Sequence, residues 1–243
     1  MSGYGPFWRR GLPLILGVAT AAYAAVVRPR ALRWGATRDE AVRTFPGDDL
    51  IPYADGQSTM ATTLPARPEE VWLWLQQMGC KRAGWYSWDL LDHFGRPSTK
   101  KIVPEWQDLK EGQHLETVPS GETWFTAAKV DPPRSLVLRA DLKLPSGRPF
   151  DPLLRPPARA YSEGIWGFHL EPATADSTRL VVRTRGRSRP QPLMRTVDLV
   201  FWEPVHLIMQ TRQSRNMQTR QSRNLRRRIR TNAAARTQEP TGS

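Results

Sequence analysis

The chain has 243 residues, of which 39% are hydrophobic and 24% charged, so neither a disordered chain nor a polytopic membrane protein fits. A single cysteine, Cys80, excludes an intramolecular disulfide and a multi-thiolate metal site. The four histidines show no metal-ligand spacing, and no nucleophile or phosphate-binding motif is present. We therefore expect no metal and no cofactor.

The net charge of +13 is confined to the two ends of the chain. Residues 1–34 carry five arginines and residues 209–236 carry nine, with no acidic residue in either range, whereas residues 35–208 hold 22 basic and 22 acidic residues. A nucleic-acid-binding domain would carry its charge on the folded face, so nucleic acid is disfavoured as a partner. Charge at both ends favours a module held near an anionic membrane surface.

Residues 11–27 contain no charge and are flanked by arginines on both sides. A bilayer-spanning helix needs about 20 residues, with about 17 as the lower limit. We predict a single-pass N-terminal membrane anchor. A cleaved secretory signal is the first alternative, because residues 22–24 (Ala-Tyr-Ala) resemble a cleavage site, and a buried or surface helix is the second. Arg38 adds charge on the C-terminal side, which weakly favours a cytoplasmic domain.

The pattern that follows predicts a connector over residues 34–57. Its short helix begins at a capping box, Thr37–Glu40, and ends before Pro46. Apolar residues at helical spacing then predict a helix over 68–79, and an aromatic segment predicts a second helix over Tyr86–Phe94.

Runs of β-branched, aromatic and aliphatic residues between turn signals predict six strands. They are Ser58–Leu64, Gly112–Val118, Glu122–Val130, Arg134–Ala140, Tyr161–Glu171 and Thr178–Arg185. Residues 141–160 contain five prolines and predict a loop. A long helix is expected from about Leu193, kinked at Pro204. The domains are then an anchor (1–33), a connector (34–57), an α+β domain (58–208) and a basic extension with a tail (209–243).

The C-terminal segment contains a tandem duplication. Met209–Asn216 reads MQTRQSRN, and Met217–Asn224 repeats it letter for letter. Eight residues rotate a helix by about 800°, so the second copy faces a direction about 80° from the first. We therefore expect the helix to leave the core near Met209, with the duplicated part on the surface or on a membrane.

The order of these elements is that of a helix-grip fold, in which a curved antiparallel sheet wraps around a long C-terminal helix. Several stretches resemble the bacterial SRPBCC (START-like, polyketide-cyclase-related) superfamily, in particular its uncharacterised actinobacterial members with an N-terminal hydrophobic segment. They are RWGAT (33–37), PGDDL (46–50), PEEVWLWLQQMG (68–79), GWYSWDLLD (84–92), PEWQDLKEGQ (104–113) and EPVHLIM (203–209). The resemblance implies a cavity between sheet and helix, and it is less specific for function than for fold.

Ten tryptophans are many for this length, and most fall in the predicted domain. They are interpreted either as core packing or as the lining of a pocket for a hydrophobic small molecule or lipid. Polar contacts would come from Glu203 and His206, one helical turn apart on the last helix. The candidate ligand-binding residues are Trp85, Tyr86, Trp88, Asp89, Trp106, Trp166, Trp202, Glu203 and His206.

Two other classes of function stay open. The first is a cyclase or dehydratase acting on a polyketide-like or aromatic substrate, with Asp89 or His206 as general base. The nearby Asp92 and His93 would share that space, although such groups are more often exposed helix charges or caps. The second is an interaction module that docks a partner through its basic ends. The sequence favours a binding protein over either, and it specifies no oligomeric state.

Overall fold

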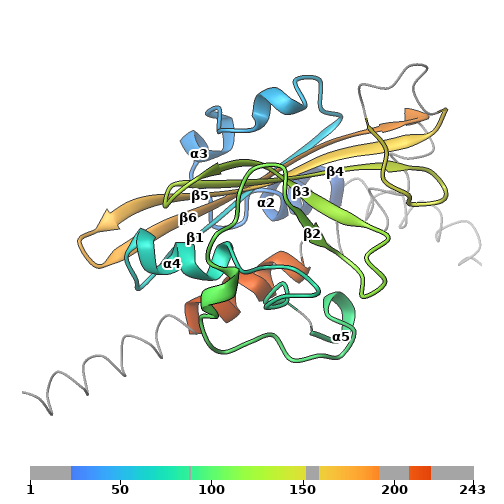
Figure 1. Cartoon of the computed structure of the whole chain (residues 1–243). Helices are drawn as coiled ribbons and strands as arrows, with labels where there is room; N and C mark the ends of the chain where they lie inside the picture. The colour runs from blue at the N-terminus through green and yellow to red at the C-terminus, as the bar shows by residue number, and fades with distance from the viewer. Residues whose placement is uncertain (1–22, 88, 152–158, 192–207, 220–243) are drawn as a thin grey trace, which may run out of the picture.

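A computed structural model describes residues 23–87, 89–151, 159–191 and 208–219. Its centre is a six-stranded antiparallel sheet in the order β1-β6-β5-β4-β3-β2 (Figure 1). The strands are β1 (Gly56–Leu64), β2 (His114–Glu116), β3 (Trp124–Asp131), β4 (Ser135–Lys143), β5 (Tyr161–Thr174) and β6 (Ser177–Arg189). All six strands predicted from the sequence are present, and the α+β class is confirmed.

The described helices are short and lie on both sides of this sheet (Figure 1). They are η1 (Tyr23–Val27), α2 (Arg28–Ala31), α3 (Arg38–Val42), η2 (Asp48–Leu50), α4 (Pro68–Leu75), α5 (Asp89–Asp92) and η3 (Pro104–Trp106). Residues 208–219 form a further helix, drawn in orange. It lies with α4 and α5 on one side of the sheet, and α3 lies on the other.

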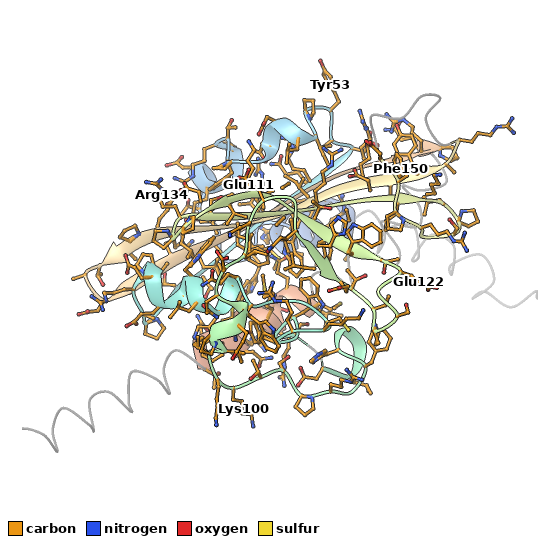
Figure 2. The ribbon with its side chains drawn as sticks, in the orientation of Figure 1. Tyr53, Lys100, Glu111, Glu122, Arg134 and Phe150 are labelled. Atoms are coloured by element: carbon orange, nitrogen blue, oxygen red, sulfur yellow. The ribbon has the colours of Figure 1, made fainter. Side chains whose placement is uncertain are left out.

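Alternation along the strands divides the sheet into two faces. The inner face carries Leu136, Phe168 and Leu180, which share the main core with α4 and with Met217 of the last helix. The outer face carries Val137, Ile165 and Val181, which pack under the segment that contains α3 and η2. Figure 2 shows the two layers from the side: Tyr53 projects from the outer layer and Lys100 from the opposite, inner one.

The outer layer is held by carboxylates that pair with arginines of β6. The predicted capping box is confirmed, since Thr37 and Glu40 exchange side-chain to backbone hydrogen bonds at the start of α3. Glu40 also binds Arg179, at 2.7 Å from Nε, and these bonds lower the pKa of Glu40 to about 2. Asp48 and Arg183, both buried, form a second pair at 3.1 Å. Residues 36–55 therefore pack closely against the outer face.

The free edge of β1 is covered by the chain that precedes α3. The amide of Thr59 donates to the carbonyl of Leu32 at 2.8 Å, and the amide of Ala61 donates to that of Trp34 at 3.0 Å. These bonds satisfy part of an edge that would otherwise expose backbone donors. Residues 32–34 are thereby fixed beside β1.

Two sequence predictions about helices are wrong. The helix expected over Tyr86–Phe94 is reduced to α5, because Tyr86 adopts a left-handed backbone conformation (φ 59°) that no α-helix accommodates. The last helix does not leave the core at Met209: Gln210, Gln213, Ser214 and Met217 are all buried. The first copy of the repeat, Met209–Asn216, is thus part of the packed domain. The same holds for Met217 in the second copy, and the described part of this helix ends at residue 219.

None of the helices within the described ranges has both the length and the apolar character that crossing a bilayer requires. Most of the predicted anchor, residues 11–27, lies outside these ranges, as does the predicted helix from Leu193 to 207.

Candidate functional site

A row of residues without large side chains crosses four strands of the inner face. Gly56 pairs with Gly186, Gly186 with Gly164, and Gly164 with Ala140. A Cβ atom added to Gly56 would meet nothing within 4 Å, and at Gly164 or Gly186 it would meet only a backbone carbonyl oxygen, 3.7 or 3.4 Å away. Among the described residues, no side chain of another element fills the space directly above these three glycines. We call Gly56, Gly186, Gly164 and Ala140 the glycine row.

The next row along the strands carries a tryptophan. It consists of Ser58, Thr184, Trp166 and Leu138, paired in register. Because side chains two residues apart on a strand share a face, Trp166 stands directly beside Gly164. The hydroxyls of Ser58 and Thr184 lie 2.6 Å apart and bond to each other. One side of the glycine row is therefore bounded by an indole ring and a satisfied hydroxyl pair.

Trp166 belongs to an aromatic cluster with Trp85, Phe125 and Phe168. Its ring stacks on Trp85 with centroids 5.7 Å apart, and Phe168 lies 4.8 Å away. Phe125 contacts Trp85 edge-on at 5.4 Å. Such offset and edge contacts fix the orientation of the rings. The cluster forms a rigid apolar wall beside the glycine row.

Charge is absent from the inner face of the described strands. Every arginine of β6 has an odd number and points to the outer face, whereas Leu180 and Val182 point to the inner core. β1 has no charged residue. The acidic and basic residues of β3, β4 and β5 also lie on the outer face, because residues paired in register share a face. Lys129 pairs with the outer-face residue Val137, and Asp141 pairs with Glu163. The described sheet thus offers no ion-pair partner to a molecule lying on its inner face.

The last helix lies across this face and is tied to the loop that carries Trp85. Gln213 donates its amide to the carbonyl oxygen of Trp85 at 2.7 Å, and Asn216 donates to the carbonyls of Tyr86 and Ser87 at 2.9 and 3.1 Å. Ser87 in turn donates its hydroxyl to the carbonyl of Met209. Trp85, Tyr86 and Ser87 are all buried because the core lies on one side of this loop and the helix on the other.

The helix lies beside the end of β1 and the segment that covers its edge. Gln218 donates to Thr62 Oγ1 at 2.6 Å, and Thr211 lines one groove with Trp34, whose carbonyl accepts from the amide of Ala61. Residues 210, 213, 214 and 217 occupy one helical face, and Met217 of that face belongs to the inner core. Gln210 is therefore directed inward, one helical turn before Gln213, whose amide bonds the carbonyl oxygen of Trp85 in the aromatic cluster.

Gln210 is only 1% exposed, and neither its amide nitrogen nor its amide oxygen has a hydrogen-bond partner. A buried side-chain amide without partners is rare, because each unmade hydrogen bond leaves a desolvation cost. The other buried glutamines described on this helix face and directly after α4 are Gln213, Gln76 and Gln77, and all three are bonded.

A separate open groove of about 480 Å³ lies between η1–α2 and the last helix, lined mainly by Val26, Val27, Trp34 and Ile208. Val26, Val27 and Ile208 are about half exposed. Arg30 also lines this groove, and because the first acidic residue of the chain is Asp39, the preceding segment supplies it with no carboxylate.

The residues predicted from the sequence to bind a ligand are distributed over several environments. Trp85 and Trp166 are together in the aromatic cluster. Tyr86 is buried, with its hydroxyl accepting a bond from Gln77 at 2.7 Å. Trp106 lies at the rim of the core, where its carbonyl accepts from Arg82, whose pKa is lowered by burial. Trp88, Trp202, Glu203 and His206 lie outside the described residues.

Asp89 begins α5 and accepts a hydrogen bond from Ser98 Oγ. The nearby His93 is buried and bonds through Nε2 to the carbonyl of Cys80 at 2.8 Å. Each of these side chains thus has a partner that fixes the loop between α4 and η3. In the part of the chain that the structure describes, no three His, Cys, Asp or Glu side chains are grouped as metal ligands.

Sequence reasoning missed the glycine row and Gln210. The signal for the first was present, since Gly164 and Gly186 occupy positions that alternate in step with the buried residues of their strands. Gln210 carries no such signal, because its letter is repeated at Gln218 and the repeated segment has the composition of a surface helix.

Together the fold and these features define an α+β protein in which one face of an antiparallel sheet packs against a C-terminal helix. No protein-family model and no curated protein matches the chain. Among solved structures, the chain is similar to protein MLL2253 from Mesorhizobium loti, with 16% identity over 69% of this chain and 98% of that one, at a TM-score of 0.39. A protein from Arthrobacter aurescens matches with 14% identity over 75% of this chain and 92% of that one, at a TM-score of 0.39. A START superfamily protein from Mycobacterium smegmatis matches with 11% identity over 69% and 97%, at a TM-score of 0.35.

Proposed function

We propose that the protein binds a hydrophobic small molecule or lipid between the inner face of the sheet and the C-terminal helix. The observation that carries this proposal is the glycine row beside the aromatic cluster. Three glycines in register leave bare backbone on the face that also carries Trp166, Phe168 and Leu138. A strand interior gains stability from side chains that pack, so glycines there are typical of a site where another group approaches the backbone.

The chemistry of the surroundings favours an apolar ligand. The aromatic cluster offers ring faces and edges, and the described strands place no charge on this face. Ligand sites in proteins are mostly apolar, with a few placed polar groups. The resemblance of the sequence to the SRPBCC superfamily, with its helix-grip fold, agrees with this proposal.

We further propose that this binding takes place at an anionic membrane surface. The groove between η1–α2 and the last helix presents Val26, Val27 and Ile208 to solvent beside arginines that have no nearby acid in the sequence. Apolar side chains flanked by arginines match the boundary between acyl chains and anionic headgroups, where each cation contributes about 1 kcal/mol.

Ligand binding is tested by extraction from the full-length protein. The protein is purified from a bacterial host, its bound apolar molecules are extracted, and their amounts are measured by mass spectrometry. Gly164→Val fills the glycine row with a side chain suited to a strand, and we expect it to reduce the bound amount at least about tenfold while the fold is kept. Ile165→Val is the matched control, because Ile165 follows Gly164 in the strand and its side chain points to the outer face.

Equal amounts of extract from wild type and Gly164→Val would overturn the site. An empty wild-type protein that also binds no member of a lipid and aromatic panel would overturn the proposed function and favour an interaction module. Membrane binding is tested separately with vesicles of phosphatidylglycerol or phosphatidylcholine. We expect flotation with the anionic vesicles to weaken in the double variant Val26→Asp, Val27→Asp.

The enzyme alternative receives no specific support from the described residues. Its candidate base Asp89 is engaged by Ser98, and the other candidate, His206, lies outside the described ranges. Binding without catalysis is therefore the function that we propose.

A further inference from the structure

The buried amide of Gln210 restricts the chemistry of the ligand, and the argument rests on the function proposed above. Both polar atoms of this side chain are buried and unbonded, on the helix face that is directed to the inner side of the sheet. Left empty, such a group opposes folding because water has been removed from it without replacement. A polar group supplied by a bound molecule would remove that cost.

The surroundings determine which polar group fits. A carboxamide offers two N–H donors and one carbonyl acceptor, so its best partner both donates and accepts. The hydroxyl pair of Ser58 and Thr184 on the tryptophan row is already closed at 2.6 Å. The basic side chains of β6 point away to the outer face, where Asp48 and Glu163 bind Arg183 and Arg187.

An ionised head group would therefore lose its hydration on this face without gaining an opposite charge from the described strands. Burying an unpaired ion costs far more than burying a neutral polar group. A carboxylate would also satisfy only the donors of Gln210 and leave its carbonyl oxygen unpaired.

We infer that Gln210 is the polar anchor of the site, and that the ligand is an uncharged, mostly apolar molecule with one group that both donates and accepts hydrogen bonds. A carboxamide, a hydroxyl group or an un-ionised carboxylic acid has this chemistry. The apolar part of the ligand lies on the glycine row and against the aromatic cluster, and its neutral head meets the Gln210 amide.

Two matched ligand series test the inference on the full-length protein at pH 8. One is naphthalene, 2-naphthol, 2-naphthamide and 2-naphthoate, and the other is decane, decanol, decanamide and decanoate. Affinities are measured by tryptophan fluorescence. Within each series we expect the amide and the alcohol to bind about tenfold tighter than the hydrocarbon, as one buried hydrogen bond provides, and the carboxylate to bind weakest.

The variant Gln210→Leu should abolish the preference for the amide and the alcohol over the hydrocarbon of the same series. Without ligand, its unfolding midpoint should not fall, because an unpartnered amide is replaced by an apolar side chain. Gln210→Met, close in length, serves as a second variant should leucine not be accommodated. The control is Gln218→Leu, which changes the equivalent letter of the second repeat copy, where the amide is bonded to Thr62. It should keep the wild-type preference.

The outcomes separate the two proposals. Equal affinity for hydrocarbon, amide and carboxylate would overturn the role of Gln210 while leaving the binding site in place. The role of Gln210 would also be overturned if Gln210→Leu kept the wild-type preference. The partner of the amide would then be an internal water and not the ligand. A wild-type protein that binds none of the eight compounds would overturn both proposals.

Discussion

Gln213 donates its side-chain amide to the backbone carbonyl of Trp85 at 2.7 Å, and the same nitrogen lies 3.7 Å from the sulfur of Met78. Trp85 stacks on Trp166 of the sheet. One hydrogen bond therefore connects the C-terminal helix, the loop after α4 and the aromatic cluster beside the glycine row. The position of the cluster depends on a polar contact from the helix.

Replacement of Gln213 by leucine should destabilise the domain. The change leaves the buried carbonyl of Trp85 without its donor, and such an unpaired group costs about 1–3 kcal/mol. Chemical denaturation monitored by tryptophan fluorescence measures the loss. Arg215→Ala, at an exposed position on the same helix, is the control and should change stability by less than about 0.5 kcal/mol. Equal stabilities for the two variants would show that the helix is not anchored through this bond.

Deletion of one repeat copy should be tolerated. Because the two copies are identical, removal of residues 209–216 or 217–224 yields the same chain, in which Leu225 follows the remaining copy in the place of Met217. Gln210, Gln213 and Asn216 keep their places, and a methionine-to-leucine change in a core costs less than about 1.5 kcal/mol. The bond from Gln218 to Thr62 is lost, for about 1 kcal/mol more.

The measurement is the free energy of unfolding of the deletion variant. A folded protein that has lost about 1–3 kcal/mol agrees with the contacts described up to residue 219. A chain that no longer folds would contradict the prediction that the contacts of the first repeat copy hold this helix on the domain.

The strands were predictable because their signal is local. Alternation of apolar and polar residues, interrupted by turn signals, located all six strands to within a few residues. The same alternation separates Leu180 and Val182, which face the core, from Arg183 and Arg185, which face the outer layer. The capping box at Thr37 was predictable for the same reason, since its two partners are three residues apart.

The loop around Trp85 and the fate of the repeat were not predictable in this way. Tyr86 holds a left-handed backbone because its hydroxyl is bound by Gln77 and its carbonyl by Asn216, which is 130 residues away. The letters MQTRQSRN have the composition of an exposed helix. Gln213 is buried and Asn216 half-buried where a distant loop offers them carbonyl groups, and no periodicity in the sequence reports that.

The buried ion pair between Asp48 and Arg183 should be far more important for stability than the exposed pair between Asp49 and Lys129. Asp48 is buried, accepts from the amide of Phe45 and binds Arg183 through both oxygens. Asp48→Ala leaves a buried guanidinium without its counter-ion, which costs about 3–5 kcal/mol. Asp49, the next residue, pairs with Lys129 while exposed, so Asp49→Ala should cost no more than about 1 kcal/mol. Equal losses in thermal unfolding would contradict the assignment of the outer layer as a buried electrostatic contact.

Stability should fall in mild acid because of His169. This side chain is buried on the outer face, stacks on Phe45 at 4.7 Å and bonds through Nδ1 to Ser135, while Nε2 has no partner. Burial, with the nearby guanidinium groups of Arg183 and Arg43 acting in the same direction against the opposing charge of Asp48, lowers the pKa of His169 to about 4.

In the unfolded chain the histidine titrates near pH 6.5. The folded state therefore loses stability as the pH falls from about 6.5 to about 4, where the unfolded chain binds a proton that the folded one does not, and the loss approaches about 3 kcal/mol. Above pH 6.5 the contribution is constant. Unfolding free energies measured between pH 8 and pH 4 should show this slope in wild type and lose it in His169→Gln.

Glu40→Gln is the control variant. Because the folded pKa of Glu40 is about 2, its carboxylate stabilises the folded state above about pH 4.5, so its replacement should leave the slope between pH 6.5 and pH 4.5 intact. A His169→Gln profile parallel to wild type across this range would show that His169 accepts its proton without opposing the fold.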